Sequence, residues 1–152
     1  MKRFKIVLAF IAIIIFISCD SDMDDISLSN AEVNELNQMV REGEWRISQF
    51  SLKGSDQTAN FDEYLFVFED ANDLSANSSL DQLTGTWRIS NDSGSEFESY
   101  NDVDFNIYFS SNGKLGALTR NYDVISATQN EINLNLENGE DGDSVILSFS
   151  KN

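Results

Sequence analysis

The 152-residue sequence contains no histidine, a single cysteine and only ten basic residues against 26 acidic ones. Without histidine, the chain cannot build a Ser-His-Asp or Cys-His nucleophile, a histidine-ligated zinc site or the usual general base of neutral pH. A single cysteine rules out an internal disulfide. The chemistry left to an enzyme is a pair of carboxylates, as in glycoside hydrolysis. Because no catalytic motif accompanies the acidic residues, we predict a protein that is not an enzyme, and we assign no catalytic residue, metal ligand or cofactor.

The charge of the chain limits its partners. The formal net charge is −16, and the basic residues beyond position 18 are spread singly from Arg41 to Lys151. Such a charge repels nucleic-acid phosphate and anionic head groups, and no basic patch offsets it. We therefore expect no nucleic-acid partner, whereas cationic partners and divalent ions remain compatible with the charge.

Residues 1–18 have the pattern of a secretory signal peptide. Lys2, Arg3 and Lys5 precede a run over residues 6–17 without a charged or polar side chain. A bilayer-spanning helix needs ~20 apolar residues, so this run fits a removable segment better than a permanent anchor. Its removal leaves 134 residues and moves the formal charge from −16 to −19, because three basic residues depart.

The end of this run, Phe16-Ile17-Ser18-Cys19, resembles the lipobox of bacterial lipoproteins. In a lipobox, a small residue precedes a cysteine that receives lipid and becomes the mature N-terminus. The resemblance implies cleavage after Ser18 and attachment of lipid to Cys19, although Ser stands where Gly or Ala is commoner. Each buried CH₂ group contributes about 0.8 kcal/mol, so several acyl chains hold a soluble domain at a membrane. The alternative role of a lone cysteine is a buried thiol.

Residues 19–28 form a short acidic segment that includes Asp20-Ser21-Asp22-Met23-Asp24-Asp25. A solvated tether between the lipid and a domain has this composition. The segment also resembles the acidic export signal that follows the lipidated cysteine in surface lipoproteins of the Bacteroidota. That resemblance implies an outer-membrane location, with exposure on the cell surface as a further option.

Residues 29–152 fit one domain that begins with a helix. Ser29 and Glu32 have the spacing of a capping box. An apolar stripe follows at helical spacing, formed by Val33, Leu36 and Val40. Gly43 can take the left-handed conformation that ends a helix. We predict a helix over residues 30–42 whose stripe packs against the domain.

From residue 43 onward, apolar and polar side chains alternate with the period of a strand. The clearest run is 144–150, with Val145, Leu147 and Phe149 on one face. Further runs cover residues 45–53, 64–69, 86–90, 103–109, 115–119, 122–128 and 132–136. No helix-length segment separates them, which excludes parallel crossovers and favours an antiparallel meander that closes into a barrel or sandwich. We predict an all-β barrel of eight or nine strands with one N-terminal helix.

A sequence pattern that occurs twice in the chain supports a single barrel. The segment that opens with Gly43-x-Trp45 recurs 42 residues later as Gly85-x-Trp87. At an offset of 41, Phe66, Phe68 and Leu74 match Ile107, Phe109 and Leu115. Two separate domains of about forty residues would lie near the size at which a core alone fails. We interpret this pattern as a pseudo-repeat within one barrel.

The order of these motifs resembles that of lipocalin-like lipoproteins of the Bacteroidota over residues 43–151. The matching positions are Gly43-x-Trp45, Thr58-x-x-Phe61-x-x-Tyr64-x-Phe66-x-Phe68, Gly85-x-Trp87 and Ile146-Leu147-x-Phe149. A third Trp-x-Val strand is replaced by Tyr122-Asp123-Val124. The resemblance implies a lipocalin-like barrel whose closed end is covered by the helix, and packing roles for Trp45 and Trp87.

Three functional hypotheses remain open at this point. An eight-stranded barrel is either filled by side chains or wide enough for one small ligand, and bulky inward Phe and Ile favour a filled or narrow interior with a cup at the open end. The first hypothesis is therefore an anchored protein that binds a small apolar or amphipathic ligand in the barrel mouth. The second is a surface module with a filled barrel that binds protein or glycan through its loops. The third, a hydrolase, requires two carboxylates that face a cleft.

Residues 138–143 are rich in Asn, Gly, Glu and Asp and look like a calcium loop. They lack the spacing of carboxylates and the bidentate Glu that such a loop requires. We interpret them as a solvated hairpin turn.

Overall fold

The structure is a computed structural model that describes residues 33–91, 103–111, 113–137, 139 and 142–152. The signal peptide over residues 1–18, the lipid attachment at Cys19, the tether over residues 19–28 and the start of the domain at residue 29 lie outside the described residues. They therefore stay predictions.

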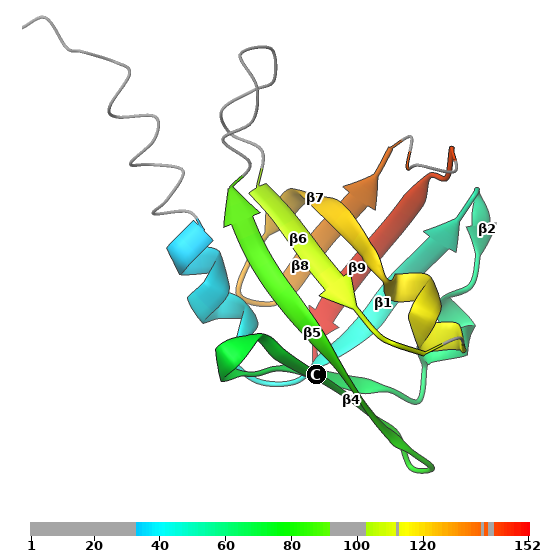
Figure 1. The fold of residues 1–152 in the computed structure, drawn as a ribbon, viewed down its shortest axis with the longest axis horizontal. Coiled ribbons are helices and arrows are strands. Elements are labelled where there is room, and N and C mark those ends of the chain that lie inside the picture. Colours follow the sequence, from blue (N-terminus) through cyan, green and yellow to red (C-terminus); the bar gives the residue numbers. More distant parts are fainter. Residues whose placement is uncertain (1–32, 92–102, 112, 138, 140–141) are drawn as a thin grey trace, which may run out of the picture.

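In the described part of the chain, nine antiparallel strands form one sheet that closes on itself (Figure 1). The strands are β1 (Trp45–Leu52), β2 (Ser55–Asp56), β3 (Leu65–Phe68), β4 (Asp73–Asn77), β5 (Gln82–Asn91), β6 (Val103–Tyr108), β7 (Arg120–Ala127), β8 (Glu131–Leu136) and β9 (Val145–Lys151). Neighbours follow chain order from β3 to β9, and the pairing of β1 with both β3 and β9 closes the ring of eight. β2 is a two-residue hairpin extension of β1. The predicted all-β antiparallel barrel with one helix is confirmed.

The alternating pattern explains which strand faces are buried. In β9, Val145, Leu147 and Phe149 are buried, and Leu147 and Phe149 lie opposite Leu134 and Ile132 of β8. Because successive side chains of a strand point to opposite faces, this register places all of these residues inside the barrel.

The N-terminal helix covers residues 33–40 of the described chain and covers one end of the barrel (Figure 1). Leu36 and Val40 are buried in the same core as the strands, and the indole Nε1 of Trp45 donates a hydrogen bond to the Val40 carbonyl (2.8 Å). Gly43 has a φ of 91°, the left-handed conformation that was predicted for it. The helix ends two residues earlier than predicted, because residues 41 and 42 form a turn.

Aromatic side chains fill the middle of the barrel. The ring of Phe68 meets those of Trp87, Phe105 and Phe149 edge to face, with centroids 5.5, 5.5 and 5.6 Å apart. Trp45 and Trp87 are both buried, which confirms their predicted packing roles. Among the described residues, the core runs from Leu36 to Phe149 and joins the helix to the sheet. Because a chain that begins at residue 26 contains all of these residues, we expect it to fold on its own.

The prediction of a strand over residues 115–119 is wrong. This segment is the 3₁₀ helix η3 (Lys114–Leu118), in which Leu115 and Leu118 are both buried. Two side chains three residues apart lie on the same side of a 3₁₀ helix but on opposite faces of a strand. Close backbone approach also shapes the segment, because a Cβ on Gly116 would lie 2.1 Å from the carbonyl oxygen of Ser111.

A tight turn joins the first two strands, and two strands, β2 and β4, were not predicted. Lys53 and Gly54, with φ values of 52° and 76°, form the turn alone, while residues 55–56 pair with β1 as β2. β4 was not predicted, although it pairs with β3 on one side and β5 on the other. The pseudo-repeat therefore holds for Trp45 opposite Phe66 and Trp87 opposite Ile107 and breaks where β4 corresponds to η3.

Candidate functional site

Among the described residues, the aromatic part of the core ends one layer before the helix-covered end of the barrel. Phe105 of β6 and Tyr122 of β7 are fully buried, whereas Val103 and Val124, the next inward positions toward the helix, are only half-buried. In the described part of the chain, no aromatic side chain forms a further layer above these two valines. They face a hollow between the strands and the helix instead.

We call this hollow the helix-end groove. Its volume is about 380 Å³, and it is lined by Glu35, Leu36 and Met39 of the helix, Val103 of β6 and Val124, Ile125, Ser126 and Ala127 of β7. Six of the eight lining side chains are apolar. Sites for small ligands have this composition and span roughly 300 to 1,000 Å³, so the groove lies at the small end of that range.

A β-bulge shapes the strand that forms one wall of the groove. The pairing of β7 with β8 shifts between Val124 and Ser126, and the extra residue, Ile125, leaves its side chain 60% exposed. A bulge bends a strand and redirects its side chains. Here it places an accessible apolar side chain at the rim of the groove.

The polar groups of the groove lie at its rim. Glu35 and Ser126 are both exposed, and the Ser126 hydroxyl accepts a hydrogen bond from the Asn133 side chain (3.1 Å). Met39, which is half-buried, adds an unbranched side chain that can adapt to irregular shapes. The arrangement can hold an apolar body between helix and strands with a polar group near Glu35.

A second hollow lies on the outer wall of the barrel. It has a volume of about 570 Å³, and β5, β6 and β7 form most of it together with residues 71–72. It shares no lining residue with the helix-end groove. The two hollows are therefore separate candidate sites.

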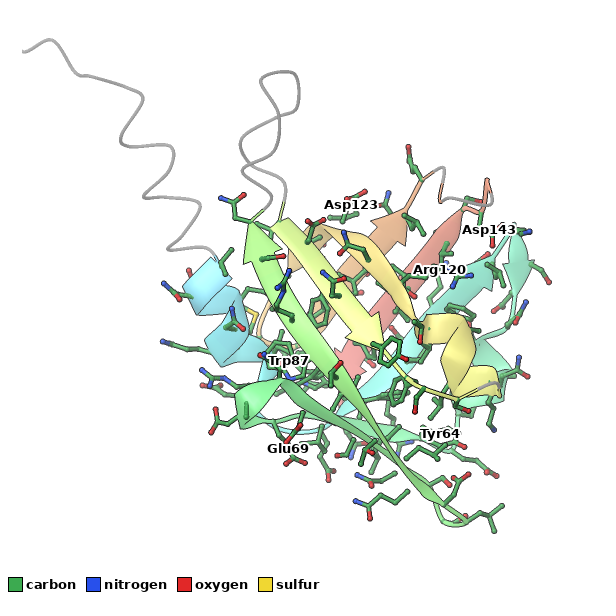
Figure 2. All side chains as sticks on the ribbon, in the orientation of Figure 1. Tyr64, Glu69, Trp87, Arg120, Asp123 and Asp143 are labelled. Carbon is green, nitrogen blue, oxygen red and sulfur yellow. The ribbon has the colours of Figure 1, made fainter. Side chains whose placement is uncertain are left out.

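The far end of the barrel, opposite the helix, holds a buried acidic residue. Asp143 is 8% exposed, and its carboxylate oxygens lie 2.6 Å from Lys53 Nζ and 3.5 Å from Arg120 Nη2. Figure 2 shows Arg120 and Asp143 close together at this end. The 2.6 Å contact is an ion pair by distance but lacks hydrogen-bond geometry. Two cations thus pair with Asp143, the one buried carboxylate among the described residues of the segment that looks like a calcium loop.

Neither a metal cluster nor a spanning helix is found in the described part of the chain. No group of three or more His, Cys, Asp or Glu residues there is placed to hold a metal ion. Within the same residues, no helix is long and apolar enough to cross a bilayer.

The lining residues of the helix-end groove were not predicted from the sequence. The one available signal is Val124-Ile125, two adjacent apolar residues within an otherwise alternating run. Such a break in the alternation is typical of a β-bulge. The groove also depends on how closely the helix approaches β7, which the periodicity of the sequence does not specify.

The fold is similar to that of solved structures, whereas comparisons by sequence find no relative. No protein family and no curated protein matches the sequence. The crystal structure of a DUF4847 family protein from Bacteroides vulgatus superimposes with a TM-score of 0.51 over 77% of this chain and 97% of that one, at 13% identity. At this identity the likeness concerns the barrel fold alone.

Proposed function

We propose that this protein is a lipoprotein of the cell envelope, held at the outer membrane by lipid on Cys19, whose lipocalin-like domain binds a small amphipathic molecule in the helix-end groove. The observation that carries the proposal is that, among the described residues, aromatic packing ends one layer below the helix. Val103, Val124 and Ala127 face inward there but are only half-buried. Apolar positions without a covering layer favour occupation by an apolar ligand.

The groove favours a ligand with an apolar body and a cationic or hydrogen-bond-donating head. Its walls are apolar, while Glu35 supplies a carboxylate at the rim. The net charge of −19 after removal of the signal peptide raises the local concentration of cations around the domain. An anionic amphiphile would be repelled both by the Glu35 carboxylate and by the net negative charge of the domain.

The position of the groove fits the proposed anchor. The helix that forms one wall begins within about fifteen residues of Cys19, and an extended chain spans at most ~3.6 Å per residue. The groove therefore lies within about 50 Å of the lipid. A ligand that is itself derived from a membrane would be available at this distance.

A fluorescence titration tests the groove. We expect the domain from residue 26 onward to bind the apolar dye N-phenyl-1-naphthylamine, and dodecylamine to displace the dye more effectively than dodecyl sulfate. Ala127→Trp fills the groove and should abolish dye binding, whereas Leu80→Trp, a matched change at an exposed hairpin tip, should leave it intact. Equal dye binding by both variants would contradict the proposal.

The anchor has its own test in cells. In the full chain, Cys19→Ala removes the proposed site of lipid attachment, and we expect the product to be soluble or to keep its signal peptide. Membrane fractionation measures the first outcome and N-terminal mass the second. A processed Cys19→Ala protein that stays in the outer-membrane fraction would contradict the anchor without affecting the groove.

A further inference from the structure

Basic side chains are scarce in this protein, and nearly all of them are engaged. Of the seven basic residues beyond position 18, six have a partner. These six are Arg41 with Asp70, Arg46 with Asn152, Lys53 and Arg120 with Asp143, Lys114 over the Tyr64 ring and Lys151 over the Trp45 ring. Within the described residues, Arg88 alone forms no ion pair, hydrogen bond or ring contact. Its guanidinium is exposed and available for a ligand.

Arg88 lines the second hollow, on the outer wall of the barrel, which we call the outer-wall groove. No carboxylate is among its lining residues. The groove is lined by Ala71, Asn72, Thr86, Trp87, Arg88, Asn106, Ile107, Tyr108, Thr119, Arg120 and Asn121, so two arginines and no acidic residue contribute to it. This composition stands out in a chain with 26 acidic residues. The free guanidinium therefore has no internal competitor for an anion within the groove.

The strand register places hydrogen-bonding groups and an aromatic ring beside Arg88. Arg88 lies opposite Asn106, and Asn106 lies opposite Asn121 on the other side. One step along the same face, Thr86 lies opposite Tyr108, whose side chain is 55% exposed. Side chains directly opposite each other in antiparallel strands have Cβ atoms about 5 Å apart, so these groups form one continuous surface.

We propose that the outer-wall groove binds a carboxylate-bearing sugar. The Arg88 guanidinium matches a carboxylate with two parallel hydrogen bonds. Asn106 and Asn121 each offer an amide with both donors and an acceptor, which suits sugar hydroxyls. The exposed ring of Tyr108 supplies an apolar face for the C–H groups of a sugar ring. An inorganic anion would use the guanidinium but leave the ring and amides without a role.

The overall negative charge does not prevent this binding. Exposed charges are largely screened beyond about 8 Å at physiological ionic strength. The contact with Arg88 lies well within that distance. Asp73, opposite Thr86, and Asp104, two residues from Asn106 on the same strand face, border the groove but do not line it. This site goes beyond the proposed function, since it lies outside the barrel wall and shares no residue with the helix-end groove.

Isothermal titration calorimetry on the domain from residue 26 onward tests the proposal. The probes are oligosaccharides of galacturonic and glucuronic acid, with the matched galactose and glucose oligosaccharides as neutral controls. We expect an acidic oligosaccharide to bind at least about tenfold more tightly than its neutral counterpart, because hydrogen bonds between charged groups are stronger than those between neutral groups.

Substitutions at Arg88 and Tyr108 test whether these side chains contact the sugar. Arg88→Gln should weaken binding about tenfold or more, and Arg88→Lys should recover part of it, because lysine keeps the charge without the planar fork. Tyr108→Ala should weaken binding while Tyr108→Phe retains it. Arg46→Gln, an exposed arginine on β1 outside the groove, is the matched control and should change nothing.

Four results would overturn the proposal. They are equal affinity for acidic and neutral sugars, no binding of either acidic oligosaccharide at millimolar concentration, full binding by Arg88→Gln, and displacement of the sugar by acetate at equal concentration. The last result would mean that the groove binds a simple anion rather than a sugar. Circular dichroism of each variant confirms that the fold is retained, since all substituted side chains are exposed.

Discussion

Among the described acidic residues, Asp143 is the only one whose side chain is buried. It joins three parts of the far end of the barrel, because Lys53 follows β1, Arg120 begins β7 and Asp143 itself precedes β9. A buried carboxylate is stable only while its charge is compensated. Removal of that charge leaves two cations without their common partner.

We expect Asp143→Asn to lower the free energy of unfolding by about 2 kcal/mol. This loss is smaller than that expected on breaking a fully buried ion pair, because Lys53 is largely exposed. Asp70→Asn, which removes the exposed ion pair with Arg41, should cost below about 1 kcal/mol. Urea denaturation of the domain measures both values. Equal losses in the two variants would contradict the special role of Asp143.

Tyr122 is a second residue whose environment has a measurable consequence. Its side chain is fully buried, and its hydroxyl donates a hydrogen bond to the Leu118 carbonyl (3.0 Å). Burial raises the pKa of Tyr122 far above its ordinary value, because the phenolate would lose its hydration. Since the folded state binds this proton more tightly than the unfolded state, the stabilisation is complete below about pH 10 and is lost as the pH rises above it.

Tyr122→Phe should therefore cost less stability at high pH than at pH 7. At pH 7 the variant should lose about 1 kcal/mol, the net contribution of one hydrogen bond. Above about pH 10 the wild type should lose stability more steeply than the variant, so that the difference shrinks. Thermal unfolding between pH 7 and 11 measures this, with the exposed Tyr108→Phe as control. Parallel curves for wild type and Tyr122→Phe would contradict it.

At the scale of elements, η3 shows how backbone approach overrides a strand-like sequence. The segment Leu115-Gly116-Ala117-Leu118-Thr119 contains apolar residues that suit a strand, and its counterpart in the pseudo-repeat is β4. The segment instead closes into a 3₁₀ helix packed against the loop that holds Ser111. A side chain at position 116 would block this approach.

We expect Gly116→Ala to lower stability by about 2 kcal/mol or more, because the added Cβ would meet a backbone oxygen that must shift. Gly113→Ala in the same loop should cost less than about 1 kcal/mol, since its Cβ would approach the movable Ser111 side chain at 3.2 Å. Chemical denaturation compares the two. A smaller loss at position 116 than at position 113 would refute the packing of η3.

The strands with clear alternation could be predicted from the sequence, and those held by their neighbours could not. β9 and β6 each carry three buried or half-buried apolar residues at every second position. β4 contains Asp73 and Asn77, residue types that are uncommon in strands, and is fixed by pairing on both edges. The helix-end groove escaped prediction for a related reason, because it arises from a bulge and from the distance between elements that are far apart in the sequence.

On the scale of the whole molecule, the barrel divides into regions with separate roles. Aromatic rings fill its middle, and the ion pairs of Asp143 connect the strands at its far end. Apolar side chains under the helix are only half-buried. The bulky inward residues predicted a filled or narrow interior with a ligand cup at the open end of the barrel, away from the helix. The candidate groove lies instead at the end that the helix covers. Stability and binding are thus assigned to different ends of one barrel.

The central claim is that the helix-end groove carries a small amphipathic ligand. Native mass spectrometry of the domain from residue 26 onward, purified gently from its own host, tests it most directly. We predict a discrete added mass on the wild type and on Leu80→Trp that is absent from Ala127→Trp. Wild-type protein without added mass that also fails to bind dodecylamine, or an identical added mass on Ala127→Trp, would contradict the claim.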